Sequence, residues 1–318
     1  MRSRLFARTI VLKTGIRLHI PTGLAKWGGK LVQTKTVLGL FSLLVRIAHT
    51  SRRQSSFLSS STDIGRIELP SDDRSAAALL IFGYLPHEYV ETLYLCLLGL
   101  RAQTILDIGA QYGWYSGLLA QTNPAAAVFA FEPDPQSYEC LRRNLGSLPN
   151  LTLFEQAVSS AVGVARLAVS SARGLNSIVR EVGPIIHVNQ TTVDEFCQMS
   201  SCGTIDLIKC DVEGAEIEVL IGARDLIQHS DAPIWMIEVV ADYLHEAARE
   251  PNDILEMLSS LSPDTACYEI LPNGLPEVVS RFRTKVHSNV FVVPAHRHDD
   301  FAIVAETVHR LLRPSSKL

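Results

Sequence analysis

The chain has 318 residues, of which 47% are hydrophobic and 19% charged, the composition of a soluble globular protein with one large domain and an extension, or with two small domains. Its six cysteines form no CxxC pair and show no regular spacing, which favours a reducing compartment over a disulfide framework. The net charge of −4 is unevenly divided. Residues 1–62 hold eleven Lys or Arg and no Asp or Glu, which leaves 18 basic against 33 acidic residues in the rest.

Residues 1–62 form a basic N-terminal extension, which we expect to be partly helical or disordered. A basic arm on an acidic body indicates an anionic partner, such as a membrane surface or nucleic acid, or an arm that docks on the protein itself. The apolar stretch 36–45 is half as long as the roughly 20 residues of a membrane-spanning helix, and it fits an interfacial or core-docked helix. The Arg- and Ser-rich composition also fits an organelle transit peptide. Residues 51–62 have the composition of a linker.

Residues 63–100 lead into the core with a short strand around 67–69 and a helix over 88–100. A core domain over 101–298 then alternates strands and helices, which predicts right-handed crossovers and a parallel sheet covered on both faces. The expected strands are 104–108, 128–131, 151–154, 205–210 and 234–239, and the expected helices are 114–121, 135–145, 215–228 and 252–261.

Within this alternation, residues 163–169 have the pattern of an antiparallel excursion. A polar stretch follows as far as Val188, and a helix is expected to begin near Thr192. A Pro-Asn-Gly turn then joins the last two expected strands, which pair antiparallel at one edge of the sheet. These strands are 266–271 and 289–293, and residues 299–318 form a C-terminal helix or tail.

The most informative motif follows the first core strand, where Thr104-Ile-Leu-Asp107-Ile-Gly109-Ala-Gln-Tyr-Gly113 runs from an apolar strand into a glycine turn. A dinucleotide-binding turn would carry a middle glycine, and the carboxylate of Asp107 would repel a pyrophosphate. A cationic ligand without phosphate, such as S-adenosylmethionine, suits this turn better. Gly109 and Gly113 would let the backbone approach such a ligand closely.

Further acids follow the next apolar runs. Glu132 lies 25 residues after Asp107, where an acid can accept hydrogen bonds from both hydroxyls of a ribose. A lone acid here would be read as a helix cap, but the pair at this distance favours a cofactor site. A third run ends in Ile208-Lys209-Cys-Asp211-Val-Glu213-Gly214. Because the carboxyl ends of parallel strands meet at one edge of a sheet, these acids should share one rim.

In combination, these segments resemble the FkbM-type methyltransferase family, a branch of the class I S-adenosylmethionine-dependent enzymes. The resemblance covers about residues 80–295, in six ordered segments at compatible spacing, and Gln111 and Cys210 depart from the more usual Asn and aliphatic residue. The segments are Leu106–Ser116, Phe129-Ala-Phe-Glu132-Pro133-Asp134-Pro135, Ala157-Val-Ser159 with Thr191–Asp194, Ile205–Glu216, Ile237-Glu238 and Asn289–Pro294.

The resemblance implies an α/β fold with a Rossmann-like, mostly parallel seven-stranded sheet of order 3-2-1-4-5-7-6, an antiparallel edge strand and helices on both faces. It implies S-adenosylmethionine as cofactor and O-methylation of a hydroxyl on a sugar, a glycolipid or polysaccharide unit, or a natural product. By family position, the cofactor-binding residues are Asp107, Gly109, Ala110, Gly113, Glu132 and Ala157.

The acceptor side requires a base, because an alcohol is a poor nucleophile and must lose its proton late in the reaction. Asp211 is the first candidate, as the base or as the group that orients the hydroxyl. Lys209 projects to the same sheet face and could pair with Asp211 or Glu238, which is expected at the same rim. Glu213 opens the following helix and is equally well explained as a cap.

Other interpretations remain open at this point. His245 and His187 are loop alternatives for the base, and no metal is predicted. A non-catalytic S-adenosylmethionine-binding or scaffold protein is the second hypothesis, and an NAD-dependent oxidoreductase is disfavoured by the missing middle glycine. The expected partner is a small-molecule or glycan hydroxyl acceptor and not nucleic acid. The expected location is cytoplasmic, with peripheral membrane contact through the basic arm.

Overall fold

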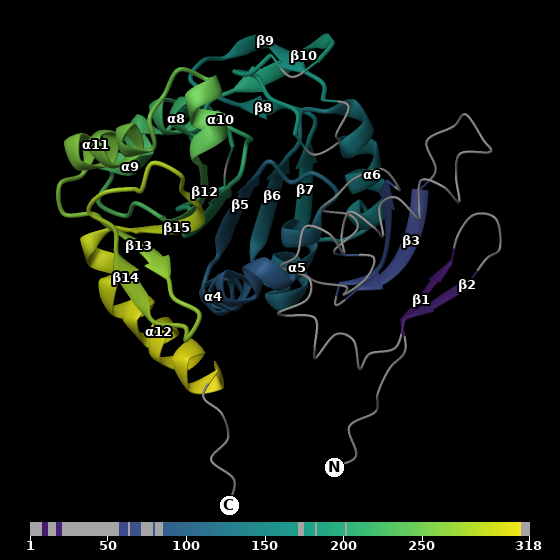
Figure 1. The fold of residues 1–318 in the computed structure, drawn as a ribbon, viewed down its shortest axis with the longest axis horizontal. Helices are drawn as coiled ribbons and strands as arrows, with labels where there is room; N and C mark the ends of the chain where they lie inside the picture. Colours follow the sequence, from purple (N-terminus) through teal and green to yellow (C-terminus); the bar gives the residue numbers. More distant parts are fainter. Residues whose placement is uncertain are drawn as a thin grey trace, which may run out of the picture.

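The protein is seen in a computed structural model that describes residues 8–11, 17–20, 57–62, 64–70, 79, 85–170, 175–181, 183–200 and 202–312. Its centre is a twisted eight-stranded sheet with helices on both sides (Figure 1). The strands are β5 (Thr104–Ile108), β6 (Ala127–Phe131), β7 (Leu151–Phe154), β11 (Leu207–Cys210), β12 (Ile234–Val240), β13 (Ala266–Ile270), β14 (Pro276–Val278) and β15 (His287–Val293).

The order across the sheet is β14-β13-β15-β12-β11-β5-β6-β7. Read from β7 and without β14, this is the predicted order 3-2-1-4-5-7-6. β5, β6, β7, β11 and β12 pair in parallel, and β15 runs antiparallel to both β12 and β13. The reversed strand β15 therefore lies inside the sheet, and an eighth strand, β14, forms the edge. The turn Pro272-Asn-Gly274 leads to β14 and not, as expected, directly to the strand near 289–293.

Each face of the sheet has its own apolar core. One face is covered by α4 (Tyr89–Gly99), α5 (Trp114–Thr122), α6 (Pro135–Leu145) and α12 (His298–Leu312). The other is covered by α7 (Val193–Met199), α8 (Glu216–Ile221), α9 (Arg224–Gln228), α10 (Ala241–Glu246) and α11 (Pro251–Leu261). Short 3-10 turns, η1 (Pro86–Glu88) and η2 (Ala295–Arg297), precede α4 and α12.

Local sequence signals set most helix ends. Asp134 accepts a hydrogen bond from the backbone N–H of Ser137, and Pro135 opens α6, so α6 begins where predicted. Thr192 caps α7 in the same way. The predicted helix over 215–228 is instead two helices, because the chain breaks at Gly222, where a β-carbon would lie 2.1 Å from the carbonyl oxygen of Ser159.

A second sheet precedes the core, with the order β2 (Arg17–Ile20), β1 (Arg8–Val11), β3 (Phe57–Thr62), β4 (Gly65–Pro70). Part of the predicted linker is thus the strand β3. β4 is attached to α6, since Ile67 and Leu69 are buried in the core and the side chain of Asn144 accepts from the backbone N–H of Glu68 at 2.7 Å. The helix expected over the apolar stretch 36–45 lies outside the described residues. Among those residues, no helix is long and apolar enough to cross a membrane.

A small third sheet lies beyond the carboxyl ends of the central strands, at the top of Figure 1. Its order is β8 (Ala157–Val158), β10 (Ile185–Thr191), β9 (Gly163–Ala168). β9 and β10 pair antiparallel, which confirms the predicted excursion. The polar stretch before Val188 was not predicted as a strand, whereas in β10 exposed side chains alternate with buried or half-buried ones.

Candidate active site

Four carboxylates gather at one rim of the central sheet. Asp107 lies in β5, Glu132 follows β6, Asp211 follows β11, and Glu238 lies near the end of β12. β6, β5, β11 and β12 are successive neighbours in the sheet and run in the same direction. The rim predicted from the strand-terminal acids is therefore present.

The glycine turn after β5 is shaped by its contacts with the protein. Gly109 has φ 84°, and a β-carbon there would lie 1.8 Å from the carbonyl oxygen of Asp211. Gly113 has φ 90°, and a β-carbon there would lie 2.4 Å from Leu145 Cδ1. Both glycines are thus required by left-handed backbone and by close packing. Protein atoms fill the space beside their α-carbons, so packing alone already requires both glycines, and their close approach to a ligand stays a prediction.

Asp107 is fully buried beneath this turn. Its Oδ2 accepts a hydrogen bond from Ser116 Oγ at 2.5 Å, and its Oδ1 lies 3.8 Å from Lys209 Nζ. Burial raises the pKa of this carboxyl, while Lys209 and Ser116 lower it. In the described part of the chain, Asp107 Oδ1 accepts no hydrogen bond. A buried acceptor without a donor is suited to a ligand that brings one, such as an ammonium group.

Glu132 connects the end of β6 to the glycine turn. Its carboxylate accepts the backbone N–H of Gln111 at 2.8 Å and that of Asp134 at 2.9 Å. Burial raises the pKa of Glu132 to about 8, although these two donors lower it. Ala110 and Ala157, the remaining cofactor-site predictions, are buried. The backbone N–H of Ala110 donates to the carbonyl oxygen of Phe131, and Ala157 in β8 pairs with Gln190 in β10.

Lys209 is the buried cation of the rim. Its Nζ lies 3.0 Å from Asp211 Oδ2 and donates to the carbonyl oxygen of Gly109 at 3.3 Å. Burial alone would lower the pKa of this amine, but the carboxylates of Asp211 and Asp107 raise it above its usual range. The predicted pairing with Asp211 is confirmed. A lysine that keeps its proton cannot serve as a base, so Lys209 acts as a counter-ion.

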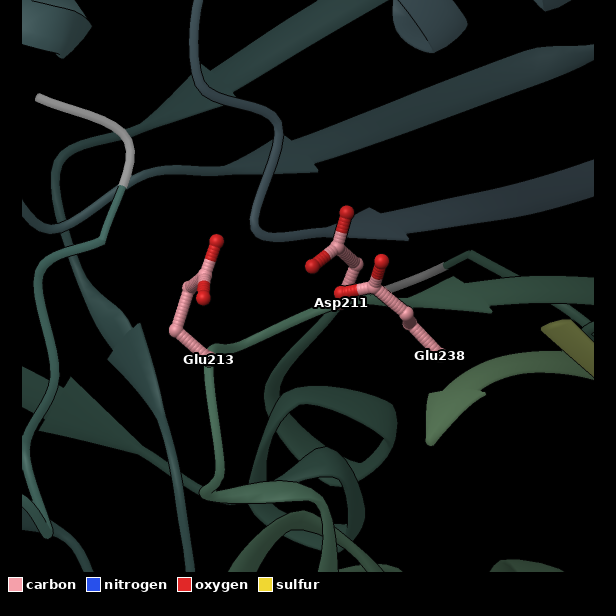
Figure 2. Close-up of side chains that lie close together, drawn as sticks. All are labelled: Asp211, Glu213 and Glu238. Atoms are coloured by element: carbon pink, nitrogen blue, oxygen red, sulfur yellow. The ribbon is translucent and has the colours of Figure 1, made fainter. Parts of the chain in front are cut away.

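The acceptor-side candidates also meet. Asp211, Glu213 and Glu238 each place a carboxylate oxygen within 4.8 Å of the others, and Figure 2 shows the three side chains converging from the end of β11 and from β12. We call these three residues the carboxylate cluster. Oxygens at this spacing suit a divalent cation, but Lys209 already lies 3.0 Å from Asp211, and Arg180 lies 3.7 Å from Glu213 Oε2. Because protein cations compensate the cluster, we assign no metal to it.

The members of the carboxylate cluster differ in acidity. Burial would raise the pKa of Asp211, but Lys209 and a hydrogen bond with Glu238 hold it below its usual value. Burial and the neighbouring Asp211 raise the pKa values of Glu238 and Glu213 well above theirs. Glu238 thus holds a proton that it can donate to Asp211, as expected for two carboxyls that cannot both ionise at close range. Its other contact is His287, 3.3 Å away.

Glu213 lies in the turn before α8, which begins only at Glu216. Its φ is 57°, in the left-handed region that side chains disfavour. The carboxylate that caps the turn is that of Glu216, which accepts the backbone N–H groups of Val212 and Gly214 at 3.3 and 3.1 Å. Capping therefore explains Glu216 and leaves Glu213 for another role.

Sequence reasoning missed several residues that contact this site, among them Arg180, Tyr115 and Glu88. The Arg180 side chain, from the loop between β9 and β10, contacts Glu213. The Tyr115 hydroxyl donates to Glu88, and Lys209 Nζ lies 5.2 Å from the Tyr115 ring centroid. A polar loop and a helix start gave no pattern by which these contacts could be foreseen.

The two histidines considered as alternative bases have other surroundings. His245 Nε2 lies 3.1 Å from Glu250, and His187 is exposed on β10 opposite Arg166. Among the described residues, no hydrogen bond or ion pair joins either histidine to the carboxylate cluster. The carboxylates are therefore the better base candidates.

Comparison with known proteins bears directly on this site. Residues 107–264, from the buried aspartate to beyond α11, match the family model of the methyltransferase FkbM domain. The 2-O-methyltransferase NoeI of Sinorhizobium fredii is 32% identical over 175 residues, which are 49% of this chain and 71% of NoeI. The chain belongs to the FkbM methyltransferase family.

Two further relatives of this FkbM protein are more distant. The hexuronic acid methyltransferase AglP of Haloferax volcanii is 26% identical over 162 residues, which are 50% of this chain and 62% of AglP. The O-methyltransferase TomG of Streptomyces achromogenes, solved with S-adenosylmethionine, aligns at 14% identity over 67% of this chain and 82% of TomG. Its TM-score of 0.40 is too low to carry an argument. S-adenosylmethionine is the methyl donor of the FkbM family.

Proposed function

We propose that this FkbM protein transfers the methyl group of S-adenosylmethionine to a hydroxyl oxygen of a sugar or a related glycan or natural-product acceptor. The observation that carries the proposal is the carboxylate cluster at the ends of β11 and β12, beside the Asp107 turn. NoeI and AglP support a sugar acceptor, because their names describe 2-O-methylation and hexuronic acid methylation.

The residues of the β5 and β6 ends fit the donor. When bound, S-adenosylmethionine supplies a sulfonium-activated methyl group. Asp107 Oδ1, which accepts no hydrogen bond among the described residues, is placed to accept one from an ammonium group. Glu132, once ionised, can accept hydrogen bonds from both ribose hydroxyls. Gly109, Ala110, Gly113 and Ala157 shape the backbone around these two acids.

The carboxylate cluster divides the acceptor chemistry between its members. Asp211 was the first candidate for the base, but its ion pair with Lys209 lowers its pKa and makes it the weaker base. Glu213 has a raised pKa, and its Oε2 accepts no hydrogen bond in the described part of the chain. We therefore assign proton removal to Glu213, and orientation of the hydroxyl to Asp211 and Glu238.

The decisive experiment incubates the purified protein with S-adenosylmethionine and candidate hydroxyl acceptors, and searches by mass spectrometry for a product heavier by one methyl group. Binding of S-adenosylmethionine is measured separately by calorimetry. Asp107→Asn should abolish binding, and Glu213→Gln should preserve binding but reduce turnover by about 100-fold or more, the typical loss of a general base. Asp206→Asn is the matched control, because Asp206 precedes β11 at the opposite rim of the sheet.

A non-catalytic S-adenosylmethionine-binding or scaffold protein is the alternative. It would bind the cofactor with an affinity that depends on Asp107, yet methylate none of the sugars, glycolipids and natural products in a metabolite extract. Unchanged binding of S-adenosylmethionine in Asp107→Asn would show that the donor site has been assigned wrongly. Titration with NAD in parallel tests the oxidoreductase reading, for which no saturable binding is expected.

A further inference from the structure

Arg180 is an arginine buried in a loop, at the point where the small sheet approaches the end of β11. Only 5% of it is exposed. Its Nε donates to the backbone carbonyl of Glu213 at 2.8 Å, and its guanidinium also donates to Leu175 O at 3.2 Å and Glu246 Oε2 at 2.9 Å. The guanidinium carbon lies 4.1 Å from the ring centroid of Tyr243. Burying a charged side chain in a loop is costly unless it is hydrogen-bonded, and each of the three guanidinium nitrogens of Arg180 donates one hydrogen bond.

The backbone that Arg180 contacts is in a disfavoured conformation. Glu213 has φ 57°, and Gly214 follows with φ 100°. A glutamate persists in this region only where its surroundings impose it. The carbonyl oxygen of Glu213 accepts both Arg180 Nε and, at 3.0 Å, the hydroxyl of buried Ser177. Both donors come from the same loop, so the β9–β10 loop holds the Glu213 turn from one side.

Arg180 also faces the Glu213 carboxylate. Its guanidinium lies 3.7 Å from Glu213 Oε2. The groups around Glu213 are the carboxylates of Asp211, Glu216, Glu238 and Glu246, the cations Lys209 and Arg180, and the phenol of Tyr243. Burial and Asp211 raise the pKa of Glu213, and Arg180 is the first group that lowers it.

We propose that Arg180, assisted by Ser177, is a positioning residue that fixes the backbone turn of Glu213 and keeps its carboxyl group able to ionise. The inference rests on the role proposed above for Glu213 as proton acceptor. The loop between β9 and β10 is then part of the catalytic machinery, although it lies outside the strand ends that carry the cluster. Loss of Arg180 should lower kcat and leave the KM for S-adenosylmethionine unchanged, because the hydrogen bonds of Arg180 go to Glu213, Glu246 and Leu175 and not to the donor residues.

The test separates geometry from charge with three variants. Arg180→Met removes both, Arg180→Lys keeps a charge but cannot make the same set of hydrogen bonds, and Ser177→Ala removes one donor only. Arg297→Met is the matched control, because Arg297 forms a 3.0 Å ion pair with Asp206 at the opposite rim. The titration of Glu213 is followed by carbon-13 NMR of its carboxyl group, and the signal is assigned by its loss in Glu213→Gln. The rigidity of the turn is measured by the rate of amide hydrogen exchange at Gly214.

In Arg180→Met, we expect Glu213 to titrate at least about 1 pH unit higher than in the wild type, the smaller end of the effect of an opposite charge at close range. The acid limb of the kcat profile should move to higher pH by the same amount. In Arg180→Lys, Glu213 should titrate close to its wild-type pH, because a positive charge is kept. The amide of Gly214 should nevertheless exchange faster than in the wild type. Ser177→Ala should speed exchange with little effect on titration, and Arg297→Met should change neither.

The proposal is overturned if Glu213 titrates in folded Arg180→Met as it does in the wild type. It is also overturned if Arg297→Met gives the same shift, since general destabilisation would then be the cause. Should Arg180→Met fail to fold, Arg180→Lys carries the test, and unchanged exchange at Gly214 in that variant contradicts the positioning role. Titration and exchange need no acceptor. A protein that shows both effects but methylates nothing would contradict the proposed function and leave the positioning of Glu213 standing.

Discussion

The charged side chains at the ends of β5 and β11 contact one another through Lys209. Lys209 lies between Asp107 and Asp211, so one buried cation serves the donor side and the acceptor side of the site. A lysine this buried remains charged because two carboxylates face it. Asp211 in turn stays ionised because Lys209 faces it, and Glu238 holds the extra proton. Glu213 is the third acid of the carboxylate cluster, and burial together with the neighbouring Asp211 raises its pKa.

Glu132 provides a residue-scale prediction about pH. In the ligand-free protein its pKa is raised to about 8 by burial, so it is mostly protonated at pH 6. Ribose hydroxyls donate to its ionised form, and binding should therefore release a proton. The affinity for S-adenosylmethionine should rise up to about tenfold per pH unit between pH 6 and 8, and level off above pH 8.

Calorimetry in buffers of different ionisation enthalpy measures both the affinity and the released proton. The amino group of the ligand also titrates in this range, so the comparison is with Glu132→Gln, which cannot ionise. That variant should bind more weakly at pH 8 and show a smaller pH dependence. Parallel profiles for the two proteins would rule out Glu132 as the titrating group.

At the scale of elements, the site depends on how closely the β5–α5 turn approaches the end of β11. The backbone N–H groups of Gly109 and Ala110 both donate to Phe131 at the end of β6, and the carbonyl of Gly109 accepts from Lys209 in β11. Three neighbouring strand ends are thereby joined in one turn. Any displacement of this turn moves Asp107, Glu132 and Asp211 relative to one another.

Gly109→Ala tests this arrangement. The substitution places a methyl group 1.8 Å from the Asp211 carbonyl oxygen, at a φ of 84° that alanine disfavours. We expect a loss of about 2–5 kcal/mol in the free energy of unfolding, from left-handed backbone and overpacking together, and no detectable S-adenosylmethionine binding. Urea denaturation and calorimetry measure the two effects.

Gly203→Ala is the matched control, since Gly203 has a similar φ of 70° but open space beside its α-carbon. Its cost should be limited to the backbone term of about 1–2 kcal/mol, with binding retained. Equal losses in the two variants would show that close packing against β11 contributes nothing.

The elements that the sequence predicted well are those with local signals. β5 is apolar apart from Thr104 and Asp107, and α6 carries both an N-cap at Asp134 and a proline at its first position. The close contact of Gly222, where the two helices separate, was not predicted because its partner Ser159 lies more than sixty residues earlier in the chain. β10 was missed because its side chains are mostly polar, and polarity on an exposed sheet resembles that of a loop.

The site shows the same division. Asp107, Glu132, Asp211 and Glu238 were predictable because parallel strands bring their ends to one rim, and they do meet there. The approach of Arg180 to Glu213 depends on a long excursion folding back over β11, which no spacing in the sequence encodes. The reason for the two glycines was also hidden, because Asp211 and Leu145 fill the space beside them only in the folded protein.

At the scale of the whole molecule, the strand β4 connects the N-terminal sheet to the core that carries the site. Ile67 and Leu69 are buried in the core beside α4, α5 and α6, and Asn144 in α6 hydrogen-bonds to both the backbone N–H and the carbonyl of Glu68. β3 pairs with β4 along its full length. A domain boundary at residue 62 would therefore separate β3 from its partner β4. The eleven basic residues of the N-terminal extension all precede β3.

This boundary sharpens a test of the basic arm, which we propose brings the enzyme to anionic lipid. Removing residues 1–56 deletes all eleven basic residues of the extension and retains the β3–β4 pair. The full chain should co-sediment with vesicles containing phosphatidylglycerol, less so as salt rises, and not with neutral phosphatidylcholine vesicles. The shortened chain should lose this binding but keep its affinity for S-adenosylmethionine, because the donor residues lie on β5 and β6. Equal sedimentation of the two chains would contradict the proposal. The shortened chain, which has 18 basic against 33 acidic residues, would then bind anionic lipid without the arm, and the charge of the arm would serve another purpose.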